Sequence, residues 1–524
     1  MDRMAFATSV VMRCGEQRSD PAQVSRRSVM KLVSSFGAFM LPGPVKVAFA
    51  DDDRIPEDIR GYASRVDSFT LPNGFKFVVL ERGVSPTVSF VTYVDVGASD
   101  EVAGKTGIAH FLEHLAFKGT QTIGTKDYAR EIALLNEIDD LNEQKKQISD
   151  KKKRKLSTID EKILSATAQA EELVISNDFS RIVQQEGGVG LNAATSIDST
   201  QYFYNFPSNK TELWFALESE RFQKPVFRQF EKEKAVVLEE RKLRVDNDSV
   251  GKFLEQYLMK AYDEHPYRRP VIGFEQDIRG LSRADVMSFF RKYYRPENIT
   301  FGIVGDTNVE EVKKLAEKYF GGFEAGEKSN RSIPEEPVQK QEKSVVMKLD
   351  SEPWYVEGYH VPAFGAPEYP ALRLLEGVLS GGRTSRLFRS LVLDKRIALQ
   401  ASFSSGFPGD KYASLGLLFA LPAPGKSLDS VRDALREQIE TLKREGVRPS
   451  ELAQIKRSLK VSYLNAFQSN ETMAGFLCEF AAKTGDAKNA FRLLSALDEV
   501  KPEDVTNLAR TIFVESNRTV GKIV

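Results

Sequence analysis

The chain has 524 residues and carries 74 Lys and Arg residues against 74 Asp and Glu residues, so its formal net charge is zero. A neutral chain has no overall field that favours nucleic acid or a membrane surface, and neither is expected as a partner. Apolar residues make up 41% and charged residues 28% of the composition, which is ordinary for a protein with a packed core. The length exceeds that of a usual single domain, so more than one domain is expected.

The first 50 residues have the features of a targeting segment. Arg26 and Arg27 lie in a sequence that resembles the twin-arginine export motif, and an apolar run, Leu32–Leu41, follows. Ala48-Phe49-Ala50 before Asp51 suits cleavage by a signal peptidase. The apolar run is too short for a permanent anchor, and no later run is long enough for a membrane span. We therefore expect export to the periplasm, or to the thylakoid lumen in a plastid-bearing organism; a disordered tail with a chance Arg pair is the alternative.

Two β-rich stretches open the part of the chain after this segment. Residues 69–80 predict a strand, a turn at Asn73-Gly74 and a second strand. Residues 87–96 predict a further strand that ends at Gly97. A helix is expected from about 106 to 117, directly after this strand, which places its side chains near the sheet.

That helix carries the sequence His-x-x-Glu-His. His110 and His114 are four residues apart, so on a helix both imidazoles lie on one face and can bind one metal ion. Glu113 lies on nearly the same face, where its carboxylate can take a proton from a bound water. Imidazole suits zinc, and a third protein ligand with one open position makes a catalytic site. A lone histidine on a helix is usually a core residue, but the chain has only four histidines, and this spacing favours the metal site.

Residues 127–177 predict a helical hairpin. Apolar residues recur at helical spacing on both sides of the basic segment 150–155. The pattern is typical of two long antiparallel helices, in the manner of a coiled-coil arm. A basic tip of this kind is more often a solvated turn than a binding site.

Paired strands and two helices are expected after the hairpin. Residues 192–204 predict two strands that follow a glycine-rich turn, and residues 213–222 and 230–241 predict helices. Glu233 and Glu240 are seven residues apart and share one face of the second helix. Two carboxylates on one face are usually solvated, but neighbouring valines indicate that this face could point inward.

Three segments together resemble the inverzincin peptidases, the family of pitrilysin, insulin-degrading enzyme and the mitochondrial processing peptidase. These segments are His-Phe-Leu-Glu-His at 110–114, the Asn-Ala-x-Thr-Ser run that begins at Asn192, and the helix at 231–240. The distance in sequence between the two parts of the motif exceeds the usual family spacing by about the length of the hairpin. The hairpin at 127–177 is therefore interpreted as an insertion into the first domain.

The resemblance implies roles for particular residues. Matching the helix to the family pattern makes Glu240 the third zinc ligand and gives Glu233 a catalytic, supporting role beside the zinc. Glu113 is the expected catalytic base, and one Zn²⁺ per chain is the expected cofactor. Asn192, Ala193 and Thr195 are the expected substrate-binding residues, because we expect the substrate to add as an extended strand to the edge that begins at Asn192. An unfolded peptide is the expected substrate, since backbone pairing selects conformation more than sequence.

An internal repeat predicts the domain organisation. Asp285 and Asp504 lie in similar segments 219 residues apart, and Asn298 and Asn517 are separated by the same distance. We therefore expect an α+β fold with two homologous domains, each a mostly antiparallel sheet with helices on one face. The expected domains are residues 61–324, which bind zinc, and 345–524, which lack the motif, with a linker at 325–344. By resemblance, the pair forms one half of a clamshell.

One departure from the family pattern concerns the second domain. Active members often carry an Arg and a Tyr there, which help to hold the substrate. Val392 stands at the position of the Arg, and Leu399 or Gln400 at that of the Tyr. Related bacterial proteins work as heterodimers, so a second two-domain subunit that supplies this pair is the expected partner, with a homodimer as the alternative.

The resulting hypothesis is a zinc-dependent endopeptidase that hydrolyses unfolded peptides or small proteins. The alternative is a non-catalytic chaperone or assembly subunit with a vestigial zinc site. The intact Glu113 favours the first hypothesis, because a vestigial site has no need of a base beside the metal.

Overall fold

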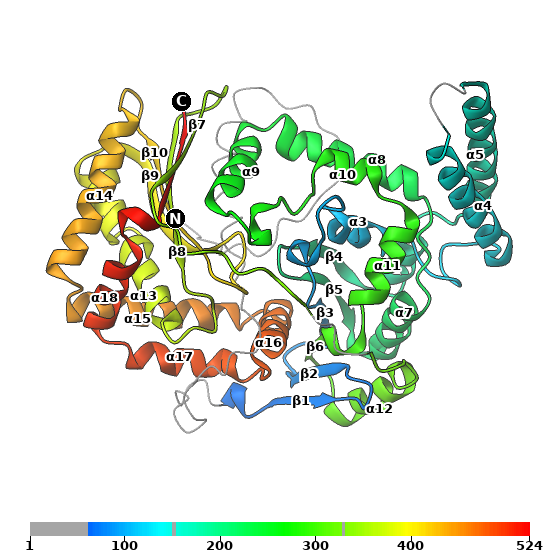
Figure 1. Cartoon of the computed structure of the whole chain (residues 1–524). Coiled ribbons are helices and arrows are strands. Elements are labelled where there is room, and N and C mark those ends of the chain that lie inside the picture. The colour runs from blue at the N-terminus through cyan, green and yellow to red at the C-terminus, as the bar shows by residue number, and fades with distance from the viewer. Residues whose placement is uncertain (1–60, 149–152, 327–330) are drawn as a thin grey trace. The chain divides into compact units, whose positions relative to one another are not determined.

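The computed structural model describes residues 61–148, 153–326 and 331–524 (Figure 1). The chain forms two compact units. The zinc-motif unit contains residues 68–241 and 270–331, and the second unit contains residues 61–67, 242–269 and 332–524 among those described. The predicted targeting segment at 1–50 lies outside the described residues, as does most of the basic hairpin tip.

A six-stranded sheet is the centre of the zinc-motif unit. Its order is β1-β2-β6-β3-β5-β4, and only β2 and β6 pair in parallel. The predicted Asn-Gly turn joins the first two strands. The strands are β1 (Val66–Thr70), β2 (Lys76–Glu81), β3 (Thr87–Val94), β4 (Val189–Thr195), β5 (Thr200–Pro207) and β6 (Ile299–Gly305).

Helices pack against this sheet through an aromatic core. Trp214 stacks on Phe90 with ring centroids 4.6 Å apart, and Phe77 and Phe301 lie 4.8 Å apart in the same layer. The helices are α3 (Ile108–Leu115), α4 (Tyr128–Lys146), α5 (Lys153–Leu173), α6 (Asp178–Gln185), α7 (Thr211–Gln223), α8 (Phe230–Arg241), α10 (Glu275–Gly280), α11 (Arg283–Tyr293) and α12 (Val309–Phe320). The helices α4 and α5 form the predicted hairpin, which projects from its unit (Figure 1).

The second unit contains a five-stranded sheet of the same plan. Its order is β7-β11-β8-β10-β9, and only β7 and β11 pair in parallel. The strands are β7 (Lys343–Met347), β8 (Trp354–Val361), β9 (Ala398–Phe407), β10 (Ser414–Pro422) and β11 (Arg518–Ile523). The helices are α9 (Ser249–Ala261), α13 (Tyr369–Ser380), α14 (Leu428–Glu445), α15 (Pro449–Ala466), α16 (Asn470–Thr484), α17 (Asn489–Glu499) and α18 (Pro502–Ile512).

The two sheets repeat each other strand by strand. The strands β2, β6, β3, β5 and β4 of the first correspond in order to β7, β11, β8, β10 and β9 of the second. The helices α11 and α18 begin and end 219 residues apart, and β6 and β11 also begin 219 residues apart. The predicted α+β class and the two homologous, mostly antiparallel domains are confirmed.

One segment belongs to a different unit from the one expected. Residues 242–269, expected in the first domain, cluster with the second, because α9 packs on β7 and β11. The Tyr257 hydroxyl donates to the Thr519 carbonyl oxygen at 2.8 Å. A Cβ atom at Gly521 would lie 2.5 Å from the Phe253 ring, so glycine at this position lets α9 approach the sheet.

The predicted linker at 325–344 stays a prediction. Among the described residues, no helix has the length and apolar character that crossing a membrane requires.

Candidate metal centre and active site

The helix α3 begins where its sequence allows close backbone contact and capping. Gly107 adopts φ 84°, and a Cβ atom there would lie 2.5 Å from the Ile272 carbonyl oxygen, so glycine is required. The Glu101 carboxylate accepts from the backbone N–H of Gly107 and of Ala109, both at 2.9 Å. This carboxylate satisfies N–H groups that the first turn of a helix leaves without partners in the helix. The cap fixes the position of the histidines one turn later.

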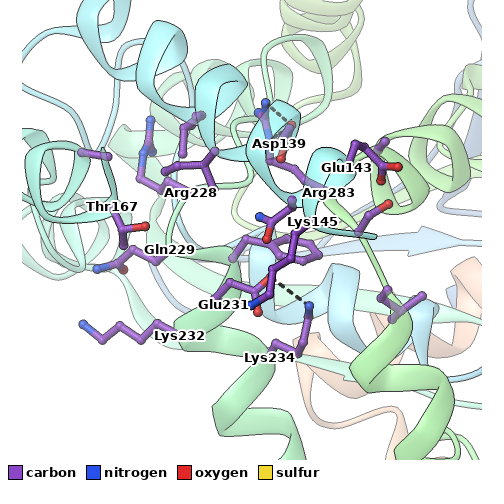
Figure 2. Close-up of a pocket in the computed structure, with 18 of the residues that line it drawn as sticks. Asp139, Glu143, Lys145, Thr167, Arg228, Gln229, Glu231, Lys232, Lys234 and Arg283 are labelled. Carbon is purple, nitrogen blue, oxygen red and sulfur yellow. Dashed lines mark hydrogen bonds and ion pairs between the residues drawn. The ribbon is translucent and has the colours of Figure 1, made fainter. Parts of the chain in front are cut away.

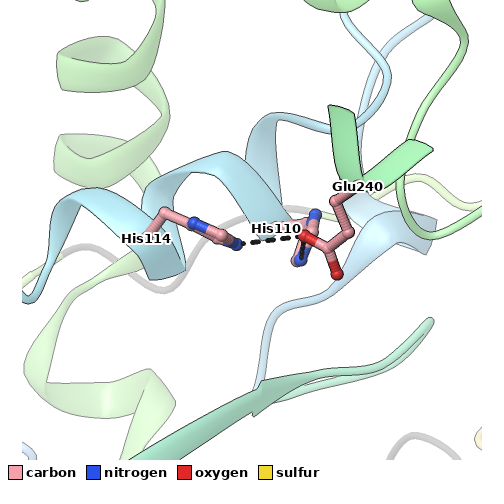
Figure 3. Close-up of side chains that lie close together, drawn as sticks. All are labelled: His110, His114 and Glu240. Carbon is pink, nitrogen blue, oxygen red and sulfur yellow. Dashed lines mark ion pairs between the residues drawn. The ribbon is translucent and has the colours of Figure 1, made fainter. Parts of the chain in front are cut away.

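Two histidines from α3 and one carboxylate from α8 converge (Figure 3). Their ligand atoms all lie within 4.8 Å of one another, and the three residues are His110, His114 and Glu240. Glu240 Oε2 is 3.6 Å from His110 Nε2 and 3.4 Å from His114 Nε2. Glu240 is buried whereas its neighbour Glu239 is exposed, as the helical turn between them requires.

Two of the three separations within this group suit a zinc ion. Ligands arranged tetrahedrally at ordinary Zn–N and Zn–O distances lie about 3.3–3.6 Å from one another. The two separations from Glu240 Oε2, 3.6 and 3.4 Å, fall in this range and exceed ordinary hydrogen-bond distances. Two imidazoles with one carboxylate are also a donor set that catalytic zinc sites use.

Glu113 lies beside this group and is held by a residue of β4. The Thr195 hydroxyl donates to Glu113 Oε2 at 2.6 Å. Burial raises the pKa of Glu113 above its ordinary value, while the Thr195 hydrogen bond and the nearby His114 oppose the rise. Thr195, expected to bind substrate, therefore contacts the expected base.

Glu233 lies on the other side of His114. Its Oε2 is 3.7 Å from His114 Nδ1, and its Oε1 accepts from the Lys118 ammonium at 2.6 Å. Burial opposes ionisation of Glu233, but His114 and Lys118 outweigh it and hold the pKa below its ordinary value. Burial likewise lowers the pKa of His114, but Glu233 and Glu240 outweigh this and raise the pKa to about 9 in the metal-free protein.

The remaining expected substrate residues lie on an edge strand. Asn192 and Ala193 belong to β4, which forms one edge of the sheet and, within the described part of the chain, pairs only with β5. Ala193 faces Tyr202 of β5, and the Asn192 Oδ1 atom accepts from the backbone N–H of Ala193 at 2.9 Å. The structure thus brings the three candidate metal ligands, Glu113 and this edge strand together in one unit.

Several residues of the site were not identified from the sequence. Glu101, Lys118 and Arg228 lie in loops, where a single charged residue gives no periodic signal. The Arg221 side chain stacks over Phe117 at 5.2 Å and was also missed. One of these residues had a signal in the sequence. Glu101 is a carboxylate six residues before Gly107, the glycine that precedes α3, and so was a candidate cap for that helix.

The segment expected to lack the Arg and Tyr lies in the second unit. Val392 is part of the π-helical turn Phe388–Asp394, and Leu399 and Gln400 lie on the edge strand β9. Leu399 is 56% exposed, so this edge presents an apolar side chain where the family pattern has a hydroxyl.

Two family models match the chain over more than half its length. Residues 77–146 and 163–274 match "Insulinase (Peptidase family M16)", and residues 280–459 match "Peptidase M16 inactive domain". The matches omit residues 147–162, the distal part of the hairpin, so the extra length lies mainly there rather than throughout 127–177.

Relatives and solved structures agree with these matches. The zinc protease PqqE of Helicobacter pylori is 27% identical over 88% of this chain and 93% of its own length. The uncharacterized zinc protease YmxG of Bacillus subtilis is 25% identical over 86% of this chain and 96% of its own. The crystal structure of a protease from Helicobacter pylori is 26% identical, with a TM-score of 0.72 over 88% of this chain and 99% of that one. From these matches and the shared two-domain plan, the chain belongs to peptidase family M16, the pitrilysin or inverzincin family.

Proposed function

We propose that the protein is a zinc-dependent endopeptidase that hydrolyses unfolded peptides or small proteins. The observation that carries this proposal is the convergence of His110, His114 and Glu240 beside the buried carboxylate of Glu113. The names of the relatives as zinc proteases support the same activity.

One zinc ion per chain is proposed at His110, His114 and Glu240. When bound, Zn²⁺ supplies Lewis acidity toward a water molecule and toward the scissile carbonyl group. Glu233 keeps the His114 ring in place by facing its Nδ1 atom, in the manner of the acidic groups that orient metal-binding histidines.

Glu113 is the proposed general base. Its carboxylate accepts a proton from the attacking water and then delivers that proton to the leaving amine, which completes hydrolysis of the amide bond. The Thr195 hydroxyl donates to Oε2 and so orients the carboxylate for this transfer. A raised pKa strengthens Glu113 as a base relative to an ordinary carboxylate.

The substrate is proposed to bind as an additional strand on β4. This strand is at the edge of its sheet and leads directly to Thr195, so a peptide added along Asn192 and Ala193 would pass beside Glu113. Binding of this kind needs an extended backbone, which folded proteins rarely offer.

The working assembly is proposed to contain a second subunit. The positions Val392, Leu399 and Gln400 support a second two-domain chain that supplies an Arg and a Tyr, with a homodimer as the alternative.

Export through the segment at 1–50 is proposed as well, to the periplasm or to the thylakoid lumen.

Metal content and peptide hydrolysis test the proposal together. Glu240→Gln is expected to lower the zinc content of the purified protein, and Glu239→Gln, at the exposed neighbouring position, is the matched control. Glu113→Gln is expected to keep zinc while hydrolysis of an unfolded peptide falls by about two orders of magnitude or more. Full zinc content in Glu240→Gln would remove this ligand. Near-normal hydrolysis by Glu113→Gln would rule out Glu113 as the base. No hydrolysis by the zinc-loaded wild type with any partner would favour the non-catalytic assembly role.

A further inference from the structure

We infer that Arg228, together with the base of the helical hairpin, positions the helix that carries Glu233 and Glu240. The hairpin is then a support of the metal centre and not a separate appendage. This inference rests on the metal site proposed above, and it adds a positioning residue that the proposed reaction does not itself use.

The guanidinium of Arg228 has an acceptor for every one of its five N–H groups. Glu131, in the first turn of α4, accepts from Nε at 2.7 Å and from Nη2 at 3.1 Å. The loop that follows α3 supplies the other acceptors, the carbonyl oxygens of Thr120 at 2.7 Å, Ile123 at 3.0 Å and Lys118. Arg228 is 1% exposed and Glu131 is fully buried, so the pair is dry and its partners are specific.

The loop after α3 is shaped around this guanidinium. Gly119 and Gly124 adopt φ 97° and 87°, and Cβ atoms there would lie 2.8 and 2.7 Å from Arg228 Nη1. No side chain fits at either position without displacing the guanidinium. The loop and Arg228 are therefore complementary in shape as well as in hydrogen bonding.

Lys118 joins this arrangement to the metal centre. Its carbonyl oxygen accepts from Arg228, and its ammonium donates to Glu233, which faces His114. Arg228 thus holds the backbone of Lys118, and the side chain of Lys118 positions the Glu233 carboxylate beside His114, a proposed zinc ligand. A shift of the Arg228 guanidinium would move Lys118 and so withdraw the support of Glu233.

The hairpin also holds the start of α8. Arg228 lies two residues before Phe230, the first residue of α8, and the intervening Gln229 donates to Glu171 of α5 at 2.8 Å. Phe230 packs on Phe111 of α3 at 4.9 Å between ring centroids. Both hairpin helices therefore fix the residues that lead into the helix of Glu233 and Glu240.

A cavity of about 440 Å³ separates the hairpin from α8 next to this anchor (Figure 2). Polar side chains project into it from both sides, among them Lys145, Thr167 and Glu231. An unfilled interface transmits position poorly, because close packing is what makes contacts rigid. The buried pair of Arg228 and Glu131, together with the bond from Gln229 to Glu171, therefore fixes the hairpin to the residues that lead into α8.

The test compares zinc binding in three variants of the purified protein. Arg228→Lys keeps the charge but loses the fork of donors, and Glu131→Gln removes only the charge of the hairpin partner. Arg283→Gln is the matched control, because the hydrogen-bond and ion-pair partners of Arg283 are both on α4: Asp139, 2.7–2.9 Å away, and Asn136 at 2.8 Å. Zinc affinity is measured by chelator competition, and the ligand geometry by the absorption spectrum of the Co²⁺-substituted protein.

We expect Arg228→Lys to bind zinc about 10-fold or more weakly and to change the Co²⁺ spectrum. Glu131→Gln should show a smaller effect in the same direction, and Arg283→Gln should match the wild type. If Arg228→Lys does not fold, Glu131→Gln alone decides.

Thermal unfolding with and without zinc separates positioning from general stability. A variant that loses as much melting temperature without zinc as with it, while its zinc affinity and Co²⁺ spectrum stay unchanged, would overturn the inference. If the wild type itself binds no zinc through Glu240, the proposed function fails instead, so the two failures are distinguishable.

Discussion

At the scale of single residues, Thr195 stands at the junction of two roles. It is the last residue of the edge strand proposed to receive the substrate, and its hydroxyl donates to Glu113 at 2.6 Å. A substrate-binding role and a base-positioning role make different kinetic predictions, since one acts on the bound ground state and the other on the transition state.

Thr195→Val is expected to lower kcat with little change in KM. A hydrogen bond to a charged group is worth about 1.5–3 kcal/mol, so the rate should fall about 10-fold or more. Thr195→Ser keeps the hydroxyl and should restore most of the rate. Steady-state kinetics on an unfolded peptide check this; a rise in KM with normal kcat would assign Thr195 to substrate binding instead.

His265, in the second unit, predicts a pH dependence of stability. Burial, together with the neighbouring His360 and Arg269, lowers its pKa from 6.5 to about 4. Its Nδ1 atom accepts from the backbone N–H of Tyr267 at 3.1 Å, so the folded protein holds the ring neutral. Between these two pKa values the unfolded chain binds a proton that the folded chain does not, so stability falls as the pH falls from 6.5 toward 4.

The His265 contribution amounts to about 3 kcal/mol when fully lost at low pH. We expect His265→Asn, which keeps an acceptor for Tyr267, to have a shallower loss of unfolding free energy between pH 6.5 and 4 than the wild type. Urea unfolding across this pH range measures both slopes. Equal slopes would mean that His265 titrates in the folded protein much as it does in the unfolded chain.

The candidate ligands could be proposed from the sequence because their spacing along each helix is periodic. His110 and His114 share a helix face at a spacing of four, and Glu233 and Glu240 at a spacing of seven. Lys118 and Arg228 could not be found in this way, since their contacts join segments that lie about 100 residues apart in the sequence. Val236 was predicted wrongly. It is one of the valines that indicated an inward-facing helix surface, yet its side chain is 45% exposed.

At the scale of elements, the connection from a helix to the next strand occurs in both units, from α11 to β6 and from α18 to β11. One hydrogen bond is the same in the two copies, and two others are made in the second copy. The Asn298 amide donates to the Tyr293 carbonyl oxygen at 2.9 Å at the end of α11. Asn517 makes the equivalent bond to Ile512 at 3.0 Å at the end of α18. Asn517 also exchanges two bonds with the backbone of His360 in β8, at 3.0 and 3.2 Å.

Asn517→Ala is therefore expected to destabilise its unit more than Asn298→Ala destabilises the other. Each net hydrogen bond contributes about 1 kcal/mol, so we expect losses of about 3 and about 1 kcal/mol. Hydrogen exchange at the amides of β8 and β11, and of β3 and β6, reads each unit separately. Equal effects would show that water replaces the His360 contacts at no cost.

Helix bounds were easier to predict than helix partners. The helix predicted at 230–241 matches α8, and the hairpin at 127–177 contains α4 and α5. The sequence could not assign α9 to the second sheet. An apolar stripe indicates that a helix is buried, but it does not indicate which sheet the helix packs against. The two glycines that admit its aromatic rings, Gly358 and Gly521, lie about 100 and 260 residues further along the chain.

At the scale of the whole molecule, the proposed sharing of the active site with a second subunit predicts weak activity for the chain alone. The proposed metal ligands and Glu113 would still activate water. Val392 and Leu399 have no side-chain hydrogen-bond donors that could position the substrate. Positioning of the substrate can lower the activation barrier by several kcal/mol.

We expect the purified chain at low concentration to cleave unfolded peptides slowly, and the chain isolated with its native partner to cleave them at least about 10-fold faster. A homodimer would instead show specific activity that rises with the concentration of the chain alone. Light scattering alongside the kinetics identifies the species. A strictly monomeric preparation that is as active as any mixture would contradict the divided site.

The open edge at β4 has a cost for solubility. An unpaired strand edge is a template for any extended backbone, including that of another copy, and natural proteins usually protect such edges. Here Val189 is 64% exposed, and the register between Val189 and Asn192 is irregular, which interrupts pairing at only one end of the strand. The edge proposed to bind substrate is therefore also a site of self-association when substrate is scarce, and a bound peptide should slow the aggregation of the concentrated protein.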